Sequence, residues 1–205
     1  MKKFHFSAVI FSSMEIQSKK QLYAVDLVLL PNEQISKQTR ALHESLVSTI
    51  PNGIHFNNGK LPHISVWMGL VDDEGMDHLK EFITEAAETP IVLNEFISID
   101  RKTSFLSHWN LSLENEADIK SKYMASSRAW EKDFDLEPKR EHFAEETNQN
   151  SMNYVRKYDI ESSRLHITIG HGKLMQKSLL MTGRASWALF QLGDFCSCGE
   201  EARLF

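Results

Sequence analysis

Two segments about a hundred residues apart share one unusual pattern, and it limits what this chain can fold into. Both are apolar runs that are typical of β-strands: LPHISVWMGLV at residues 61–71 and RLHITIGHG at residues 164–172. Each contains a histidine two positions before a hydroxyl residue. Because alternate side chains of a strand share a face, His63 is expected on the face of Ser65 and Trp67, and His166 on the face of Thr168.

The segments before these two strands follow the same order in both halves of the chain. In the first half, a strand pattern at 23–31 and a helical pattern at 32–50, with Asn32 as its expected N-cap, precede the histidine strand. In the second half, a strand pattern at 103–115 and a helical pattern at 117–130 precede it. We therefore expect a duplicated strand–helix–strand unit. The second copy is longer, and residues 131–150 account for the excess as a surface insertion.

The remaining patterns complete one α+β domain. The sequence predicts a further helix over 72–88, a strand over 90–100, and a final pair of strands within 184–205 around a Gly-Asp turn. We place the whole domain at residues 22–205, after an N-terminal extension at residues 1–21. At 205 residues with 41% hydrophobic composition, the chain can bury a substantial core.

The charge of the chain argues against one class of partner. The formal net charge is −5, and residues 131–150 carry seven acidic residues against three basic ones. The rest of the chain is nearly neutral, with 21 acidic and 20 basic residues. No basic field is therefore expected to hold long nucleic acid, although a small anionic ligand can still be attracted by local positive residues.

The cysteines and the chain start indicate the compartment. Cys196 and Cys198 are one residue apart, a spacing that rarely closes a disulfide and is typical of reduced cysteines in a cytosolic protein. The start MKKFHFSAVIFSS lacks the small-residue cleavage site of a signal peptide. No segment reaches transmembrane length. We expect a cytoplasmic monomer with no membrane partner.

Two imidazoles and two hydroxyls suit the cleavage of a phosphodiester. If the two halves pack about a pseudo-two-fold axis, both histidine faces meet in one cleft. With an ordinary pKa near 6.5, one imidazole can act as the general base and the other as the general acid, each role contributing about 10²–10⁴-fold in rate. Hydroxyls can donate hydrogen bonds to the phosphate oxygens. This chemistry requires neither a metal nor a cofactor.

The equivalent placement of His63 and His166 in the two halves is a more specific signal of a catalytic pair than the tripeptide His-x-Ser/Thr alone. The chain contains four His-x-Ser/Thr matches, including those that begin at His5 and His43. We set His43 aside because it lies in a helical pattern, and His5 because it precedes the first repeated unit. The spacings of the nine histidines contain no compact ligand motif, so the sequence predicts no metal site.

The segments LPHISVWMG and LHITIGHG resemble the paired signatures of the 2H phosphoesterase superfamily. This superfamily includes cyclic nucleotide phosphodiesterases, the so-called 2′-5′ RNA ligases and 2′,5′-oligoadenylate-cleaving enzymes. The resemblance covers about residues 22–205. It implies that His63 and His166 form the acid–base pair and that Ser65 and Thr168 bind phosphate. It also implies a bilobal α+β fold, with two pseudo-symmetric lobes of mainly antiparallel sheet and flanking helices around a central cleft.

This chain departs from the family pattern beside the second histidine. Many relatives have an aromatic residue and a proline there, where this chain has Arg164 and Leu165. Some have a base-stacking aromatic five residues later, where this chain has His171. Candidates for contact with the substrate, each of which can also have a purely structural or solvated role, are Trp67, Trp109, Arg164, His171 and Lys173.

The sequence therefore predicts a metal-independent phosphodiesterase. Its expected substrates are small nucleotides or RNA ends that carry a 2′,3′-cyclic phosphate or a 2′,5′ linkage. Three alternatives stay open: a non-catalytic module that binds a nucleotide or an RNA end, RNA 2′,5′-ligation as the reverse reaction, and a metal hydrolase.

Overall fold

Seven stretches of the chain are described by the computed structural model. They are residues 21–45, 59–101, 104–111, 113–127, 164–171, 179–192 and 198–205. The predicted insertion at 131–150 lies outside them, as do Lys173, Cys196 and all but the last residue of the predicted N-terminal extension. Trp109 and His171 are described by their backbone only.

Helices and antiparallel strands follow one another along the chain, which confirms the predicted α+β class. The order is β1 (Tyr23–Pro31), α1 (Glu33–Ser45), β2 (Ile64–Val71), α2 (Asp73–Glu85), β3 (Thr89–Arg101), β4 (Ser104–Leu111), α3 (Leu113–Ser127), β5 (His166–His171) and β6 (Met181–Gln191), with a 3-10 helix at Glu200–Ala202. Every pairing between these strands is antiparallel.

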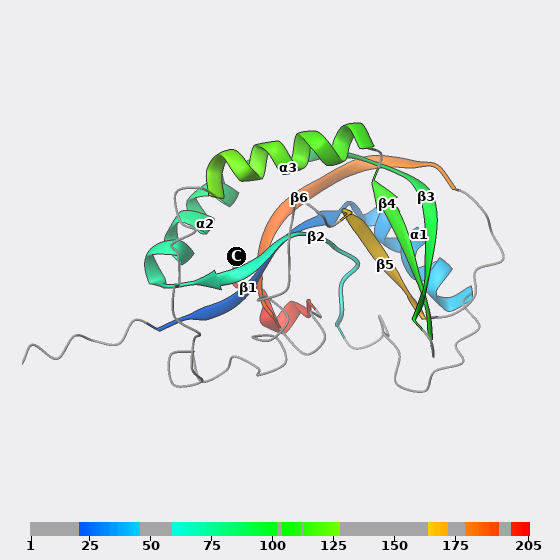
Figure 1. Ribbon diagram of the computed structural model, residues 1–205, viewed down its shortest axis with the longest axis horizontal. Coiled ribbons are helices and arrows are strands. Elements are labelled where there is room, and N and C mark those ends of the chain that lie inside the picture. The colour runs from blue at the N-terminus through cyan, green and yellow to red at the C-terminus, as the bar shows by residue number, and fades with distance from the viewer. Residues whose placement is uncertain are drawn as a thin grey trace, which may run out of the picture.

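The six strands form a closed ring of neighbours in the order β1-β2-β5-β4-β3-β6 (Figure 1). The long strand β6 pairs with β1 along one part of its length and with β3 along another, and it arches across the molecule in Figure 1. If β1 is exchanged with β4, β2 with β5 and β3 with β6, every strand keeps equivalent neighbours in the ring. In strand pairing, the units β1–α1–β2 and β4–α3–β5 are therefore equivalent.

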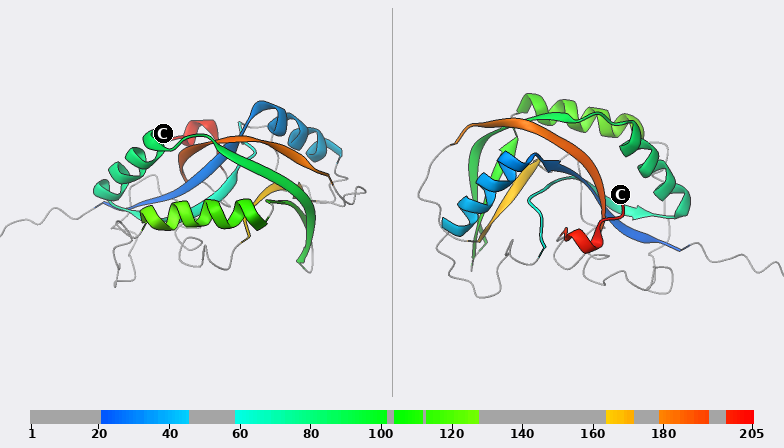
Figure 2. Two further views of the ribbon diagram at one scale, coloured as in Figure 1. Left: turned by 90° about the horizontal axis from the view of Figure 1, so that it is seen from above. Right: turned by 180° about the vertical axis from the view of Figure 1, so that it is seen from behind.

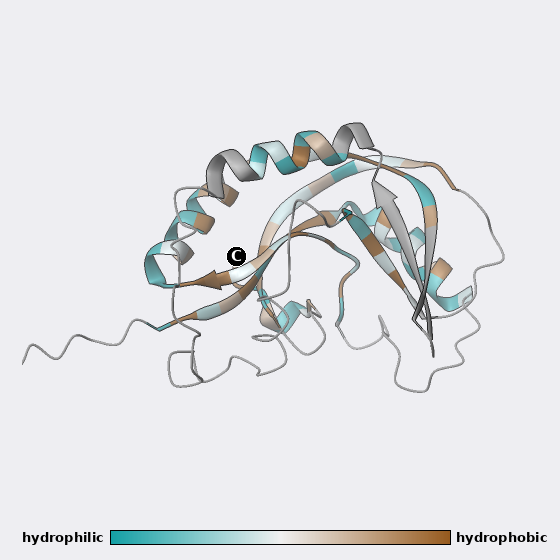
Figure 3. Cartoon of the chain, viewed as in Figure 1, coloured by the Kyte–Doolittle hydropathy of each residue, from teal (hydrophilic) through white to brown (hydrophobic). Residues whose placement is uncertain are grey.

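The three helices cover one face of this sheet. Helix α1 contacts β1, β5 and β6, helix α2 contacts β2 and β6, and helix α3 contacts β2 and β3 (Figure 2). Apolar positions follow the strands, whereas hydrophilic and hydrophobic positions alternate on the helices (Figure 3), as expected when only one side of a helix is buried. The helix residues that join the main hydrophobic cluster are Ile35, Met76, Leu79, Ile119 and Tyr123.

Alternation along β1 separates this core from the other face of the sheet. Val25 and Leu27 are fully buried in the main cluster beneath the helices. Val28 belongs to a separate cluster with Phe190, and the neighbouring position on that face is the charged residue Asp26. The second face therefore carries a buried acidic side chain as well as apolar ones.

Two helices begin after residues that are typical N-caps, an asparagine and an aspartate. Asn32, the N-cap predicted for α1, accepts a hydrogen bond from the Ile35 N–H at 3.1 Å. Asp72 accepts one from the Gly75 N–H at 3.0 Å and caps α2. These bonds satisfy backbone donors that the first helical turn leaves unpaired. No helix among the described residues has both the length and the apolar character needed to cross a membrane.

The predicted final pair of strands is only half correct. The first strand is present as β6, but the described residues 198–205 contain the 3-10 helix and isolated bridges in place of a second strand. One bridge joins Lys60 to Gly199, and the other joins Phe190 to Arg203. The C-terminal segment thus bonds both to β6 and to the residues that precede β2, which a single regular strand beside β6 cannot do.

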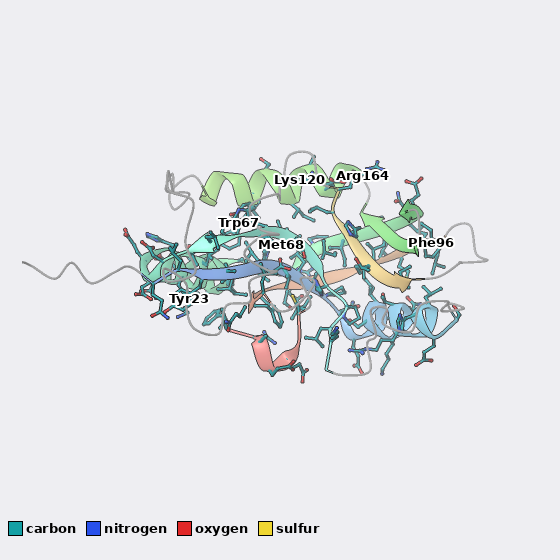
Figure 4. All side chains as sticks on the ribbon, turned by 60° about the horizontal axis from the view of Figure 1, so that its bottom comes forward. Tyr23, Trp67, Met68, Phe96, Lys120 and Arg164 are labelled. Atoms are coloured by element: carbon teal, nitrogen blue, oxygen red, sulfur yellow. The ribbon has the colours of Figure 1, made fainter. Side chains whose placement is uncertain are left out.

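Trp67 lies in the core, so the prediction that it shares the face of His63 is wrong. The register of β1 and β2 shifts by one residue between the pairs Leu27↔Trp67 and Val28↔Ser65. Such a β-bulge interrupts the alternation of side chains. Trp67 is consequently only 7% exposed, and its ring centroid lies 5.9 Å from that of Tyr123 in α3. Figure 4 shows Trp67 beside this helix.

Replacing Trp67 by alanine should destabilise the protein by about 3–5 kcal/mol, because it leaves a cavity between β2 and α3. Chemical denaturation would measure this loss. Leu180→Ala is the matched control, since Leu180 is 68% exposed and its truncation should change stability by less than about 0.5 kcal/mol. Equal stability of the two variants would contradict the core assignment of Trp67.

Candidate active site

One pair of residues joins the two histidine strands. Strands β2 and β5 are antiparallel neighbours through the register pair Ile64↔Ile167. Both isoleucines are fully buried in the main hydrophobic cluster. Because side chains alternate along a strand, the residues on either side of this pair lie on the opposite face of the sheet, away from the helices.

The four signature residues therefore lie together on that face. The antiparallel register sets His63 across from Thr168, and Ser65 across from His166. The two histidines are diagonal neighbours, a relation that separates Cα atoms by about 7–8 Å. All four residues are half-buried. Burial lowers the pKa of His63, and the positive charge of the neighbouring His166 lowers it further.

Both histidine rings are held in the same way. His63 Nδ1 lies 2.8 Å from the Leu61 carbonyl oxygen, and His166 Nδ1 lies 2.7 Å from the Arg164 carbonyl oxygen. A carbonyl oxygen can only accept, so Nδ1 must carry the proton in both rings. Nε2 is then the basic nitrogen of each neutral imidazole. The matching bonds follow from the matching position of each histidine at the start of its strand.

Burial lowers the pKa of both imidazoles, because it disfavours the charged form. For His63, the Leu61 carbonyl opposes this effect, and the charge of His166 adds to it. For His166, the Arg164 carbonyl and the charge of Glu116 both oppose it. The carboxylate of Glu116 thus acts on His166, where it favours the imidazolium form.

Glu116 also anchors the start of β5 to α3. Its buried carboxylate accepts a hydrogen bond from the Leu165 N–H at 3.3 Å and lies 2.9 Å from Lys120 Nζ. Figure 4 shows Lys120 on α3 near Arg164 at the start of β5. The side chain of Arg164 is exposed beside His166, where it can reach an anionic ligand.

The buried carboxyl group of Asp26 contacts the serine of the first motif. Ser65 Oγ donates to Asp26 Oδ2 at 2.7 Å, and Asp26 is completely buried. Burial raises the pKa of Asp26 to about 8, while the bonds from Ser65 and Cys198 act in the opposite direction. Near neutral pH this group is therefore a carboxylic acid, which can itself donate to Ser65 Oγ. The proton of the serine hydroxyl is then available to a ligand.

The C-terminal segment reaches the same place. The Cys198 thiol donates to Asp26 Oδ2 at 3.7 Å, and the Cys198 carbonyl oxygen accepts from the Leu61 N–H at 3.0 Å. Leu61 in turn holds the ring of His63. The chain end thus supports the residue that orients the first histidine.

Three potential metal ligands converge at this point, although the sequence predicts no metal site. Asp26, His63 and Cys198 each offer a ligand atom, and these atoms lie within 4.8 Å of one another. The residues are far apart in the chain, so no spacing motif could reveal the group. One signal was present: Asp26 is the only charged residue in the strand YAVDLVLLP, where a buried acid requires polar partners.

Three of the other predicted substrate contacts are Trp109, His171 and Lys173. Trp109 pairs in register with Ile167, and His171 pairs with Leu106 at the far end of β5. Their side chains, like the whole of Lys173, are outside the described parts of the chain. Of the other predicted substrate contacts, only Arg164 is placed beside a signature residue by its described side chain.

Comparisons with known proteins add no relative. No family model matches the chain, and neither a curated protein nor a solved structure matches it.

Asp26→Asn should make stability less dependent on pH in buffer that contains a metal chelator. The pKa of Asp26 rises from 3.8 to about 8 on folding, so between these values the folded state holds a proton that the unfolded state has lost. The stability of the wild type should therefore fall as pH rises from about 4 to 8, by several kcal/mol. The variant lacks this titration, so its free energy of unfolding should rise relative to that of the wild type as the pH increases across the same range.

Urea denaturation at several pH values would measure this difference. Asp118→Asn provides the matched control, because Asp118 is exposed on α3 and should leave the pH dependence unchanged. If Asp26→Asn and the wild type lost stability in parallel, the carboxyl would not hold a proton in the folded state.

Proposed function

We propose that this protein is a phosphodiesterase of the 2H phosphoesterase type, with His63 and His166 as its acid–base pair. The observation that carries the proposal is the pairing of Ile64 with Ile167, which sets both histidines and both hydroxyl residues on one face. A group of two imidazoles and two hydroxyls on one patch can bind a phosphate and transfer two protons around it.

The surroundings of the two histidines suggest which proton each transfers. Glu116 stabilises a positive charge on His166, whereas the charge of His166 disfavours one on His63. We therefore assign His63 as the general base and His166 as the general acid. In the hydrolysis of a 2′,3′-cyclic phosphate, His63 takes the proton from the attacking water. The P–O bond to one ribose oxygen breaks, and His166 gives its proton to that oxygen.

A 2′,5′-linked oligonucleotide would use the same two roles. The neighbouring 3′-hydroxyl of the ribose attacks phosphorus after losing its proton to His63, and the 5′-oxygen of the next nucleotide leaves with the proton of His166. Ser65 and Thr168 donate hydrogen bonds to the oxygens that gain charge in the transition state. The protonated carboxyl of Asp26 supports this role, because it leaves the Ser65 proton for the phosphate.

The substrate is assigned as a small nucleotide or the end of an RNA. The net charge of −5 offers no extended basic surface for a long polyanion. Arg164, exposed beside His166, provides one local positive charge for an additional phosphate. This assignment needs no cofactor.

A bilobal arrangement around a central cleft is part of the same proposal. It is supported by the exchange symmetry of the strand ring, in which β2 and β5 are equivalent neighbours. A two-fold axis through the Ile64↔Ile167 pair interchanges His63 with His166 and Ser65 with Thr168. In this arrangement each lobe supplies one histidine and one hydroxyl.

Substituting either histidine should remove most of the activity. We expect His63→Ala and His166→Ala to lower kcat by about 10²–10⁴-fold each, and Ser65→Ala and Thr168→Ala to lower it by about 10–10³-fold. The assay would follow the hydrolysis of 2′,3′-cyclic nucleotides and of 2′,5′-linked oligoadenylate, with EDTA present throughout. Circular dichroism would check that each variant is folded.

His78→Ala is the matched control, because His78 lies on α2, away from the signature residues. Its activity should equal that of the wild type. Retained activity in either signature-histidine variant would refute the acid–base assignment. Nucleotide binding without any turnover would identify the chain as a binding module, and turnover that EDTA abolishes would identify a metal hydrolase.

A further inference from the structure

The group formed by Asp26, His63 and Cys198 has the composition of a zinc site. Zinc is bound in proteins by carboxylate oxygen, imidazole nitrogen and thiolate sulfur, and this group offers one of each. Magnesium and calcium prefer oxygen ligands alone, so the nitrogen and sulfur favour a transition metal.

The distances also suit coordination. Cys198 Sγ and Asp26 Oδ2 are 3.7 Å apart. Two ligands bound to a tetrahedral zinc ion at about 2.3 Å and 2.0 Å lie about 3.5 Å from each other. The three ligand atoms are within 4.8 Å of one another, so a small contraction around the ion is sufficient.

A second observation points to an additional ligand at this place. Asp26 is completely buried, and its Oδ1 atom has no hydrogen-bond partner within the described part of the chain. A buried carboxyl oxygen without a partner is costly, and a bound ion is one established way to satisfy such an atom. Ser65, which donates to Asp26 Oδ2 at 2.7 Å, would serve as an outer partner that orients the carboxylate.

We propose that Asp26, His63 and Cys198 form a binding site for Zn²⁺, and that the bound ion inhibits the enzyme. The half-buried ring of His63 provides the route of entry, while Asp26 and Cys198 lie deeper. Binding releases the thiol proton of Cys198, and that of Asp26 where it is present, to solvent. Three protein ligands leave a fourth position for water or a phosphate oxygen.

The inhibitory role rests on the function proposed above. An imidazole nitrogen that coordinates zinc has no lone pair left for a proton, so His63 can no longer act as the general base. Thr168 and His166 are not ligands, and the phosphate-binding face otherwise stays in place. Zinc would then control activity through one of the two catalytic residues.

Cd²⁺ titration of the full-length protein, freed of metal by a chelator, tests the site without any substrate. We expect the ultraviolet charge-transfer band of a cadmium thiolate to appear with one equivalent of bound ion. Cys198→Ser should lose the band and weaken Cd²⁺ binding by more than about tenfold. Cys196→Ser, which removes the chain's other thiol, should keep both. Asp26→Asn should keep the band but bind more weakly.

Several results would overturn the proposal. One is the absence of the charge-transfer band in the wild type. Another is a band that survives in Cys198→Ser, and a third is a band that is lost in Cys196→Ser but not in Cys198→Ser. Because Cys198 is buried, Cys198→Ala provides a second variant should the serine fail to fold. A rise in the Tm of the wild type with Zn²⁺ that is missing in these variants would support the site independently.

Turnover of a 2′,3′-cyclic nucleotide tests the consequence. Zn²⁺ should inhibit the wild type reversibly, EDTA should restore its activity, and Cys198→Ser should need more than about ten times as much Zn²⁺ for the same inhibition. Activation by Zn²⁺ would overturn the inhibitory role. A Cys198-dependent band in a chain without phosphodiesterase activity would support the metal site and refute both the proposed function and the inhibition.

Discussion

The pairing of Ile64 with Ile167 is the constraint on which the candidate site depends. Burying both isoleucines beneath the helices supplies a hydrophobic driving force that holds β2 against β5. The period of two in a strand then forces the flanking residues to the other face. Apolar packing on one side of the sheet thereby positions polar chemistry on the other. A shift of one residue in this register would separate the histidines from the hydroxyls they face.

Groups that are costly to bury surround the two histidine motifs, and the hydrogen bonds and the ion pair that they form reduce that cost. Asp26 receives hydrogen bonds from Ser65 and Cys198, and Glu116 bonds to the backbone of β5 and to Lys120. Low solvent exposure makes each charge act strongly on its neighbours. This explains how two histidines in equivalent positions differ: the Glu116 carboxylate stabilises the imidazolium form of His166.

The two ends of the described chain meet at the first motif. Asp26 comes from the first strand and Cys198 from the C-terminal segment, and both contact the surroundings of His63. The second motif is supported by α3 through Glu116. The strand ring is symmetric in its pairing, yet its two halves are supported by different elements. Because of this asymmetry, His63 is part of a group of potential metal ligands, whereas Glu116 is the acidic neighbour of His166.

Local pattern in the sequence determined the order and type of the described elements from β1 to β6 and the cap at Asn32. It also determined the placement of each histidine beside a hydroxyl on its strand, because all of these depend on neighbours within a few residues. Only the tertiary structure decided which distant segments meet. It brought Asp26, His63 and Cys198 together and placed Glu116 beside His166. It also turned Trp67 into the core, because a bulge against β1 broke the alternation that a lone strand would follow. Contacts between residues far apart depend on how the whole sheet closes, and no local periodicity contains that information.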